Sequence, residues 1–134
     1  MLGDKVIDEQ GKISGRRVLP SDGGGPAVET SFEAAGTTLG ISATNMGTYK
    51  SVVRPDGTLY GEGQGVLMGK GGEMATWIGQ GVGQFTSTGG ISFRGAVYYQ
   101  SSSPAWARLN RISVVYEHEV DANGNAHNQG WEWK

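Results

Sequence analysis

The chain has 134 residues, a length that suits one domain, 1–134, with its own hydrophobic core. It contains no cysteine, which excludes disulfides, thiolate chemistry and cysteine-based metal sites. The net charge of −2 and the lack of a basic cluster argue against a nucleic-acid partner, and no window approaches the roughly 18 apolar residues of a membrane helix.

Apolar and polar residues alternate with period two between turns rich in glycine and aspartate, which predicts β-strands. The expected strands, in chain order, cover 12–19, 27–35, 38–44, 48–54, 58–68, 73–85, 91–100, 111–121 and 126–133. A turn or bulge is expected at 45–47, and one helical turn after Pro104, with Ser103 as its cap. Eight or nine strands with short links predict an all-β fold, a closed antiparallel barrel of about eight strands.

Glycine is unusually abundant, at 24 of 134 residues against a usual share of about 7%. Two trios of alternating glycines lie on neighbouring predicted strands: Gly61, Gly63 and Gly65, then Gly79, Gly81 and Gly83. Successive strand side chains point to opposite faces, so each trio lines one face of its strand. Bare backbone on one face of two paired strands indicates a sharply curved sheet.

The direction of this glycine face is left open by the sequence. If it points inward, the barrel keeps space for a small apolar ligand. That space would lie beside Leu59, Leu67, Trp77 and Phe85. If the face points outward, it forms a flat apolar patch typical of a subunit interface. The interior would then be polar, with Glu62, Gln64, Gln80 and Gln84.

The clearest alternation runs through residues 112–120 and places Tyr116 and His118 on the expected buried face. A histidine on an apolar face is typical of a hydrogen-bonded core residue, and the alternative is a ligand-binding or catalytic role. Charges within strands, such as Arg94 and Glu117, are typical of solvated faces with weak ion pairs. The alternative is one buried Arg–Glu pair that anchors a polar ligand inside the barrel.

No motif indicates a metal or cofactor, and none is expected. Asp121 and Glu132 have the spacing of a calcium loop, but Ala126 stands where that loop needs glycine, and the segment is a predicted hairpin turn. With only His118 and His127, a multi-histidine metal site cannot form within one chain.

A family resemblance follows from the order of these motifs. Thr48-Tyr49, then Asp56-Gly57-Thr58, then the glycine-rich strands, then Arg94-Gly95 resemble small uncharacterised bacterial proteins with an allene oxide cyclase-like barrel, in the calycin-like group. The similar region is 49–99. The resemblance implies a closed, often oligomeric barrel with an axial cavity, and it carries over no cyclase residues.

Three functional hypotheses follow. The first is a non-enzymatic barrel that binds a small apolar or amphipathic molecule, with fatty acids, isoprenoids and tetrapyrroles as the classes to test. Its pocket is predicted to be lined by Tyr60, Glu62, Trp77, Arg94, Tyr98, Tyr116 and His118. The second is a cyclase or isomerase in which Glu62 or Glu117 handles a proton. The third is a structural homo-oligomer that packs its glycine face on a copy.

The expected partners are therefore a small ligand and further copies of the chain, with no nucleic acid and no membrane. The first ten residues are polar and acidic and do not resemble a signal peptide, so we expect a cytoplasmic location.

Overall fold

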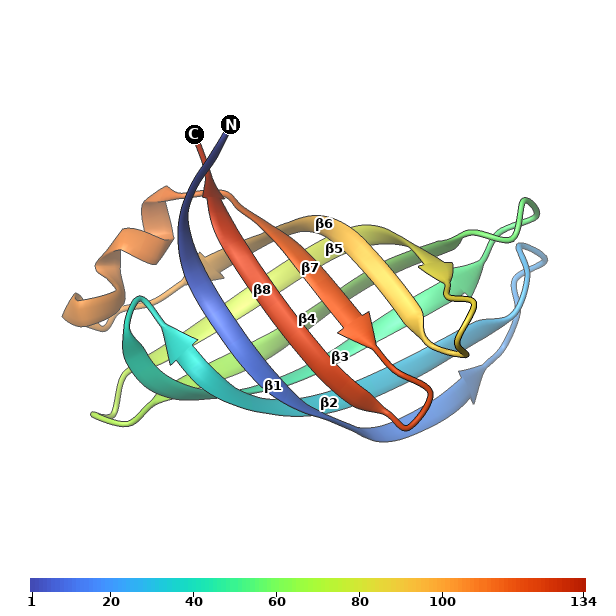
Figure 1. The fold of residues 1–134 in the computed structure, drawn as a ribbon, viewed down its shortest axis with the longest axis horizontal. Helices are drawn as coiled ribbons and strands as arrows, with labels where there is room; N and C mark the ends of the chain where they lie inside the picture. Colours follow the sequence, from blue (N-terminus) through green and yellow to red (C-terminus); the bar gives the residue numbers. More distant parts are fainter.

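In a computed structural model that describes residues 1–134, the chain forms a closed barrel of eight antiparallel strands (Figure 1). Each strand pairs with the next along the chain, and β8 returns to pair with β1. The strands are β1 (Leu2–Leu19), β2 (Ala27–Thr38), β3 (Ile41–Val53), β4 (Leu59–Gly69), β5 (Met74–Phe85), β6 (Ile91–Gln100), β7 (Val114–Val120) and β8 (Asn125–Trp133). The predicted fold class is confirmed. Closure leaves no long free sheet edge.

Two strands differ most from the prediction, while β2 also runs on to Thr38 and β7 begins only at Val114. β1 begins at Leu2, ten residues before the expected start at Lys12, and this added length pairs with β8. β3 is continuous across 45–47, where a turn or bulge was expected. The reversal before it lies at Leu39 and Gly40, which both have positive φ, 48° and 79°. Since Leu is rare in this conformation, the local sequence does not signal the turn.

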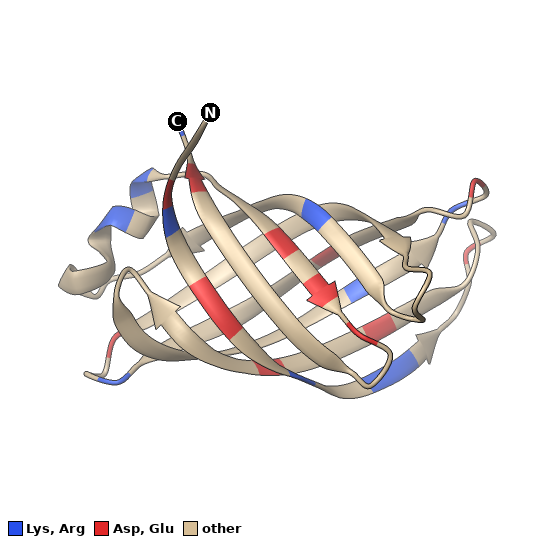
Figure 2. Ribbon diagram, viewed as in Figure 1, with Lys and Arg blue, Asp and Glu red and all other residues tan.

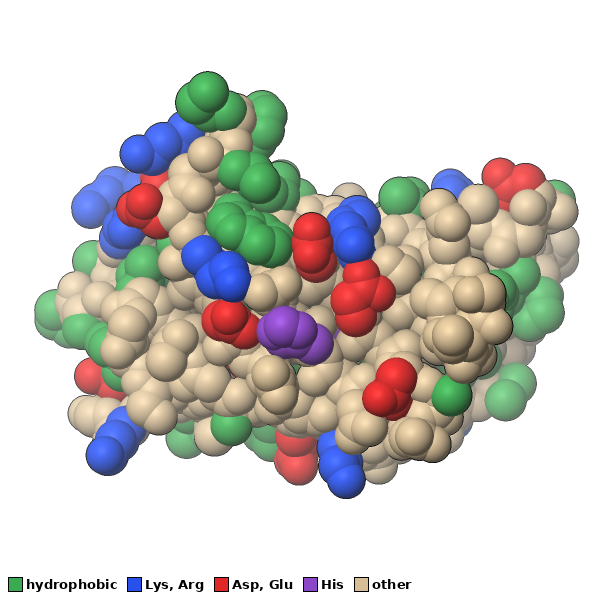
Figure 3. All heavy atoms as spheres, in the orientation of Figure 1, with side chains coloured by type: hydrophobic (Ala, Val, Ile, Leu, Met, Phe, Trp, Pro, Cys, Tyr) green, Lys and Arg blue, Asp and Glu red, His purple; other side chains and the backbone are tan.

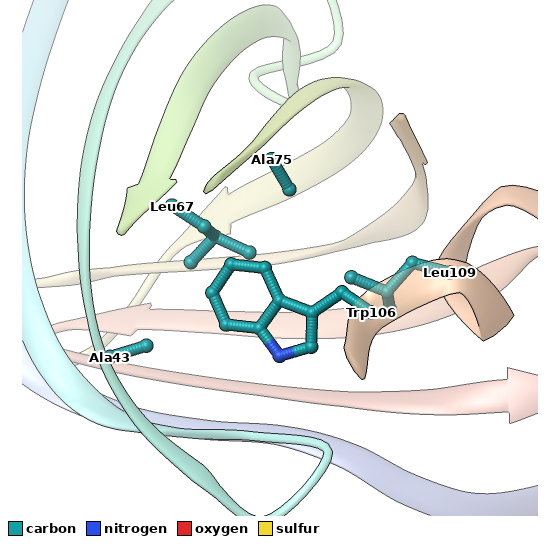
Figure 4. Close-up of a cluster of buried hydrophobic side chains, with 5 residues drawn as sticks. All are labelled: Ala43, Leu67, Ala75, Trp106 and Leu109. Carbon is teal, nitrogen blue, oxygen red and sulfur yellow. The ribbon is translucent and has the colours of Figure 1, made fainter. Parts of the chain in front are cut away.

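A short 3₁₀ helix, η1 (Pro104–Arg111), covers one end of the barrel (Figure 1). Trp106 and Leu109 are fully buried, and Figure 4 shows the Trp106 ring lying between Leu67 and Leu109. The Trp106 Nε1–H donates to the Thr38 carbonyl at 3.2 Å. The helical turn was predicted from Pro104. The expected side-chain cap is absent, because the Ser103 hydroxyl accepts from the Met74 amide instead.

Charged residues occur both in the turns and along the strands (Figure 2), and most of them are exposed or half-buried. Figure 3 shows acidic, basic and histidine side chains close to one another on the face in view. Ion pairs among these side chains include Arg94 with Glu117 and Glu119, Arg108 with Asp4 and Glu132, and Arg17 with Glu29; His127 lies against Asp8. No helix has the length and apolar character needed to cross a membrane.

Candidate functional site

Both glycine trios point into the barrel. Gly61, Gly81 and Gly83 are buried, whereas the intervening Glu62 and Gln80 are exposed. The inward alternative therefore holds, and the polar interior expected from the outward alternative is wrong. A homo-oligomer packed through the glycine face is also wrong, because that face is inside. Association through another surface stays a prediction.

Aromatic rings occupy most of the space that the glycines leave. A Cβ atom added at Gly65 would lie 2.3 Å from the Trp77 ring, and one at Gly81 would lie 2.3 Å from the Tyr116 hydroxyl oxygen. Because such distances are far below van der Waals contact, the rings lie directly on bare backbone. Phe85, which was expected beside the glycines, is exposed instead. The interior is therefore mostly filled.

A cavity of about 80 Å³ remains in the middle of the barrel. Its wall includes Ile7, Glu9, Phe32, Asn45, Tyr49, Gly79, Trp77, Phe93, Val97, Tyr99, Tyr116, His118 and Asn128. Since one water needs roughly 10–15 Å³ by this measure, the cavity has room for a molecule of about five non-hydrogen atoms. Larger lipids and tetrapyrroles exceed this volume, because pockets for drug-sized ligands are typically ~300–1,000 Å³.

The polar part of the wall is centred on Glu9, whose residue is only 4% exposed. Its Oε2 accepts hydrogen bonds from Asn45 Nδ2 at 2.9 Å and from Asn128 Nδ2 at 2.8 Å. Asn45 Oδ1 in turn accepts from Trp77 Nε1 at 2.8 Å. Both hydrogen bonds to Glu9 are made by Oε2. Oε1 has no hydrogen-bond partner, and every fully buried side-chain oxygen or nitrogen has one, so Oε1 is not fully buried. Since Glu9 lines the cavity, we infer that Oε1 faces it.

The network continues through His118, which is 7% exposed. Asn128 uses its Nδ2 on Glu9, so its Oδ1 is the atom that meets His118 Nδ1, at 2.5 Å. His118 Nδ1 therefore donates, and Nε2 shares a hydrogen bond with the Tyr49 hydroxyl at 3.1 Å. Both ring nitrogens of His118 are satisfied. The hydrogen-bonded core histidine expected from the sequence is thus observed.

Burial shifts the pKa values of these groups in opposite senses. Loss of hydration raises the pKa of Glu9, against the two amide hydrogen bonds, which lower it. Burial lowers the pKa of His118 and raises that of Tyr49 to about 12. Glu9 therefore stabilises the fold below about pH 4.5 and loses this contribution as pH rises through its folded-state pKa. His118 does the reverse: its contribution is present above about pH 6.5 and is lost as pH falls.

The structure brings together three of the seven residues predicted to line a pocket. Trp77, Tyr116 and His118 all line the cavity. The other four, Tyr60, Glu62, Arg94 and Tyr98, have side chains on the outer surface, as alternation from their inward neighbours requires. Glu62 is part of the cavity wall, but its side chain lies outside near the Tyr60 hydroxyl, 3.4 Å away.

Arg94 lies on the outer surface of the barrel. Its guanidinium is half exposed and contacts Glu119 Oε1 at 2.7 Å and Glu117 Oε2 at 3.7 Å. These are ion pairs on a solvated strand face, and the alternative of a buried Arg–Glu pair is wrong. The polar end of the cavity comes from Glu9 and its amide partners instead.

Glu9, Asn45, Asn128 and Tyr49 were missed as site residues. Glu9 lies two residues after Ile7 and therefore on the same face of the strand. A carboxyl on this apolar face could have indicated a site residue. The polar character of residues 1–11 hid the strand that carries it. No three histidine or acidic side chains come close enough to hold a metal ion.

Taken together, these features define a closed up-and-down barrel with a small internal cavity that contains a buried carboxyl. Known structures share the fold. A protein of unknown function from Clostridium acetobutylicum superposes with a TM-score of 0.83 at 12% identity, over 96% of both chains. A conserved protein of unknown function from Rhodopseudomonas palustris gives 0.81 at 14% identity, over 99% of both chains.

A third similar structure is a β-barrel-like protein from Acinetobacter baumannii, with a TM-score of 0.81 at 11% identity, over 97% of this chain and 94% of the other. No family model matches the chain, and no curated protein matches it. The likeness therefore concerns the fold alone.

Proposed function

We propose that this protein is a non-enzymatic barrel that binds a small amphipathic molecule in its interior. The observation that carries the proposal is the open oxygen of Glu9 at the edge of a cavity walled mainly by aromatic rings. A ligand with one polar group and a short apolar body satisfies both parts of the wall. The cavity volume limits that body to a few carbon atoms.

Binding inside the barrel is tested by methyl NMR with small alcohols and amines as probes. Ile7 and Val97 line the cavity, and the exposed Ile78 and Val82 report on the outer surface. We expect probe-dependent shifts at the two interior methyl groups and none at the two exterior ones. Shifts confined to Ile78 and Val82, or no shifts with any probe, would contradict the proposal.

Gly79 offers a matched variant that fills the cavity. A Cβ atom at this position would lie 3.4 Å from the Ala96 carbonyl oxygen and 3.5 Å from Val97 Cβ, which are ordinary contacts. We expect Gly79→Val to fold, and to weaken probe binding by at least about tenfold, since the added side chain takes the place of the ligand. An unchanged affinity measured in the same titration would place the binding site elsewhere.

A second candidate function, a cyclase or isomerase, is favoured by the raised pKa of Glu9 beside a cavity. Glu62 is exposed and Glu117 lies on the outer face of β7, so neither fits the predicted acid–base role. Conversion of a substrate by the wild type and not by Glu9→Gln would establish the enzyme over the binding barrel.

A further inference from the structure

We propose that the ligand of this cavity is a small organic cation, a protonated amine or methylated ammonium of about five non-hydrogen atoms, whose nitrogen lies against Glu9 Oε1. This inference rests on the proposed function and adds the charge of the ligand to it.

The charge of the cavity wall favours a cation. Glu9 is the acidic side chain that faces the interior, and none of the lining residues is Lys or Arg. His118 is a poor counter-charge, because burial favours its neutral form and both of its ring nitrogens are already bonded, to Asn128 and Tyr49. A buried carboxylate without an opposite charge is costly, and a bound cation removes that cost.

The hydrogen bonds of Glu9 leave one carboxyl oxygen available for a ligand. Two amide N–H groups already hold Oε2, which fixes the orientation of the carboxyl. Oε1 has no partner in the protein, so it is ready to accept from a ligand N–H. A charge-assisted bond of this kind is about twice as strong as a neutral one.

The aromatic wall of the cavity also favours a cation. The rings of Phe32, Tyr49, Phe93 and His118 form one cluster, with neighbouring centroids between 5.3 Å and 6.3 Å apart. Trp77 stacks on Phe32 with centroids 6.3 Å apart. Aromatic rings attract cations through their quadrupole, and most strongly where water is excluded. An anionic ligand would be repelled both by the Glu9 carboxylate and by the faces of the aromatic rings.

The protonation state of Glu9 makes the expected affinity for a cation depend on pH. Burial and the nearby Asp8 raise the pKa of Glu9, and no basic group counters them. A bound cation favours the ionised carboxylate, so binding of the cation releases the proton. Affinity for a cation should therefore fall as pH is lowered and Glu9 becomes protonated.

The test compares three probes of similar size in the methyl NMR titration: n-butylammonium, n-butanol and butyrate. We expect the wild type to bind n-butylammonium about tenfold more tightly than n-butanol, and butyrate most weakly. In Glu9→Gln, the Gln carbonyl can still accept from Asn45 and Asn128, so the fold is kept and the preference for the amine disappears. Affinity of the wild type for n-butylammonium should also fall at low pH.

The other outcomes contradict either the cation assignment alone or the binding barrel as well. Equal binding of amine and alcohol, tighter binding of butyrate, or an amine preference that survives in Glu9→Gln would overturn the cation assignment and leave the binding barrel intact. Failure of all three probes to shift Ile7 and Val97 would overturn both.

Discussion

Replacing Trp106 with alanine is expected to lower the free energy of unfolding by about 3–5 kcal/mol, a large share of the stability of a domain of this size. The ring is fully buried and, with Leu67 and Leu109, it fills one end of the barrel (Figure 4). Its loss leaves a cavity there and removes the donor to the Thr38 carbonyl. Urea denaturation followed by far-ultraviolet circular dichroism measures the change.

Trp133→Ala is the matched control, because this ring is 57% exposed at the end of β8. We expect it to cost less than about 1 kcal/mol. Similar losses of unfolding free energy in the two alanine variants would contradict the conclusion that Trp106 of η1 closes this end of the barrel.

Gly95→Ala is the second substitution with a large expected effect, a loss of at least about 2 kcal/mol. A Cβ atom at this position would lie 1.9 Å from the carbonyl oxygen of Gln80 and 2.6 Å from the Cα of Gly81. Both contacts are to the backbone of the neighbouring strand, so no side-chain rotation relieves them. The β5–β6 pair would have to separate.

The control for this variant is Gly15→Ala. Nothing lies within 4 Å of a Cβ atom added at Gly15. That substitution is expected to be neutral or to stabilise by up to about 1 kcal/mol, because it restricts the unfolded chain. Equal unfolding midpoints for the two variants would show that the strands approach less closely at Gly95 than described.

The barrel could be predicted from the sequence because the patterns that indicate its strands and turns lie within short segments. Strict alternation in 112–120 and in both glycine strands fixes which residues share a face, and turns such as that at Gly57 follow from residue type. The predicted strand boundaries were wrong where the alternation or the turn sequence is weak. Residues 2–11 of β1 are mostly polar, and the Leu39-Gly40 turn has no typical turn sequence.

The site was less accessible because it depends on strand register. Glu9 and Asn128 lie 119 residues apart in the chain and meet only because β8 closes on β1. Tyr60, Arg94 and Tyr98 were selected by residue type. The alternation could have excluded Tyr60, since it has the opposite parity to the glycines of its own strand, but only once the inward direction of the glycine face was known.

The central claim, that the barrel interior holds an open carboxyl beside a small cavity for a cation, is tested most directly by a crystal structure of the protein soaked with n-butylammonium. We predict density for the amine inside the barrel, with its nitrogen about 2.8 Å from Glu9 Oε1 and the alkyl chain against the aromatic wall. An interior closed by packed side chains, or a Glu9 Oε1 bonded to another group of the protein, would contradict it.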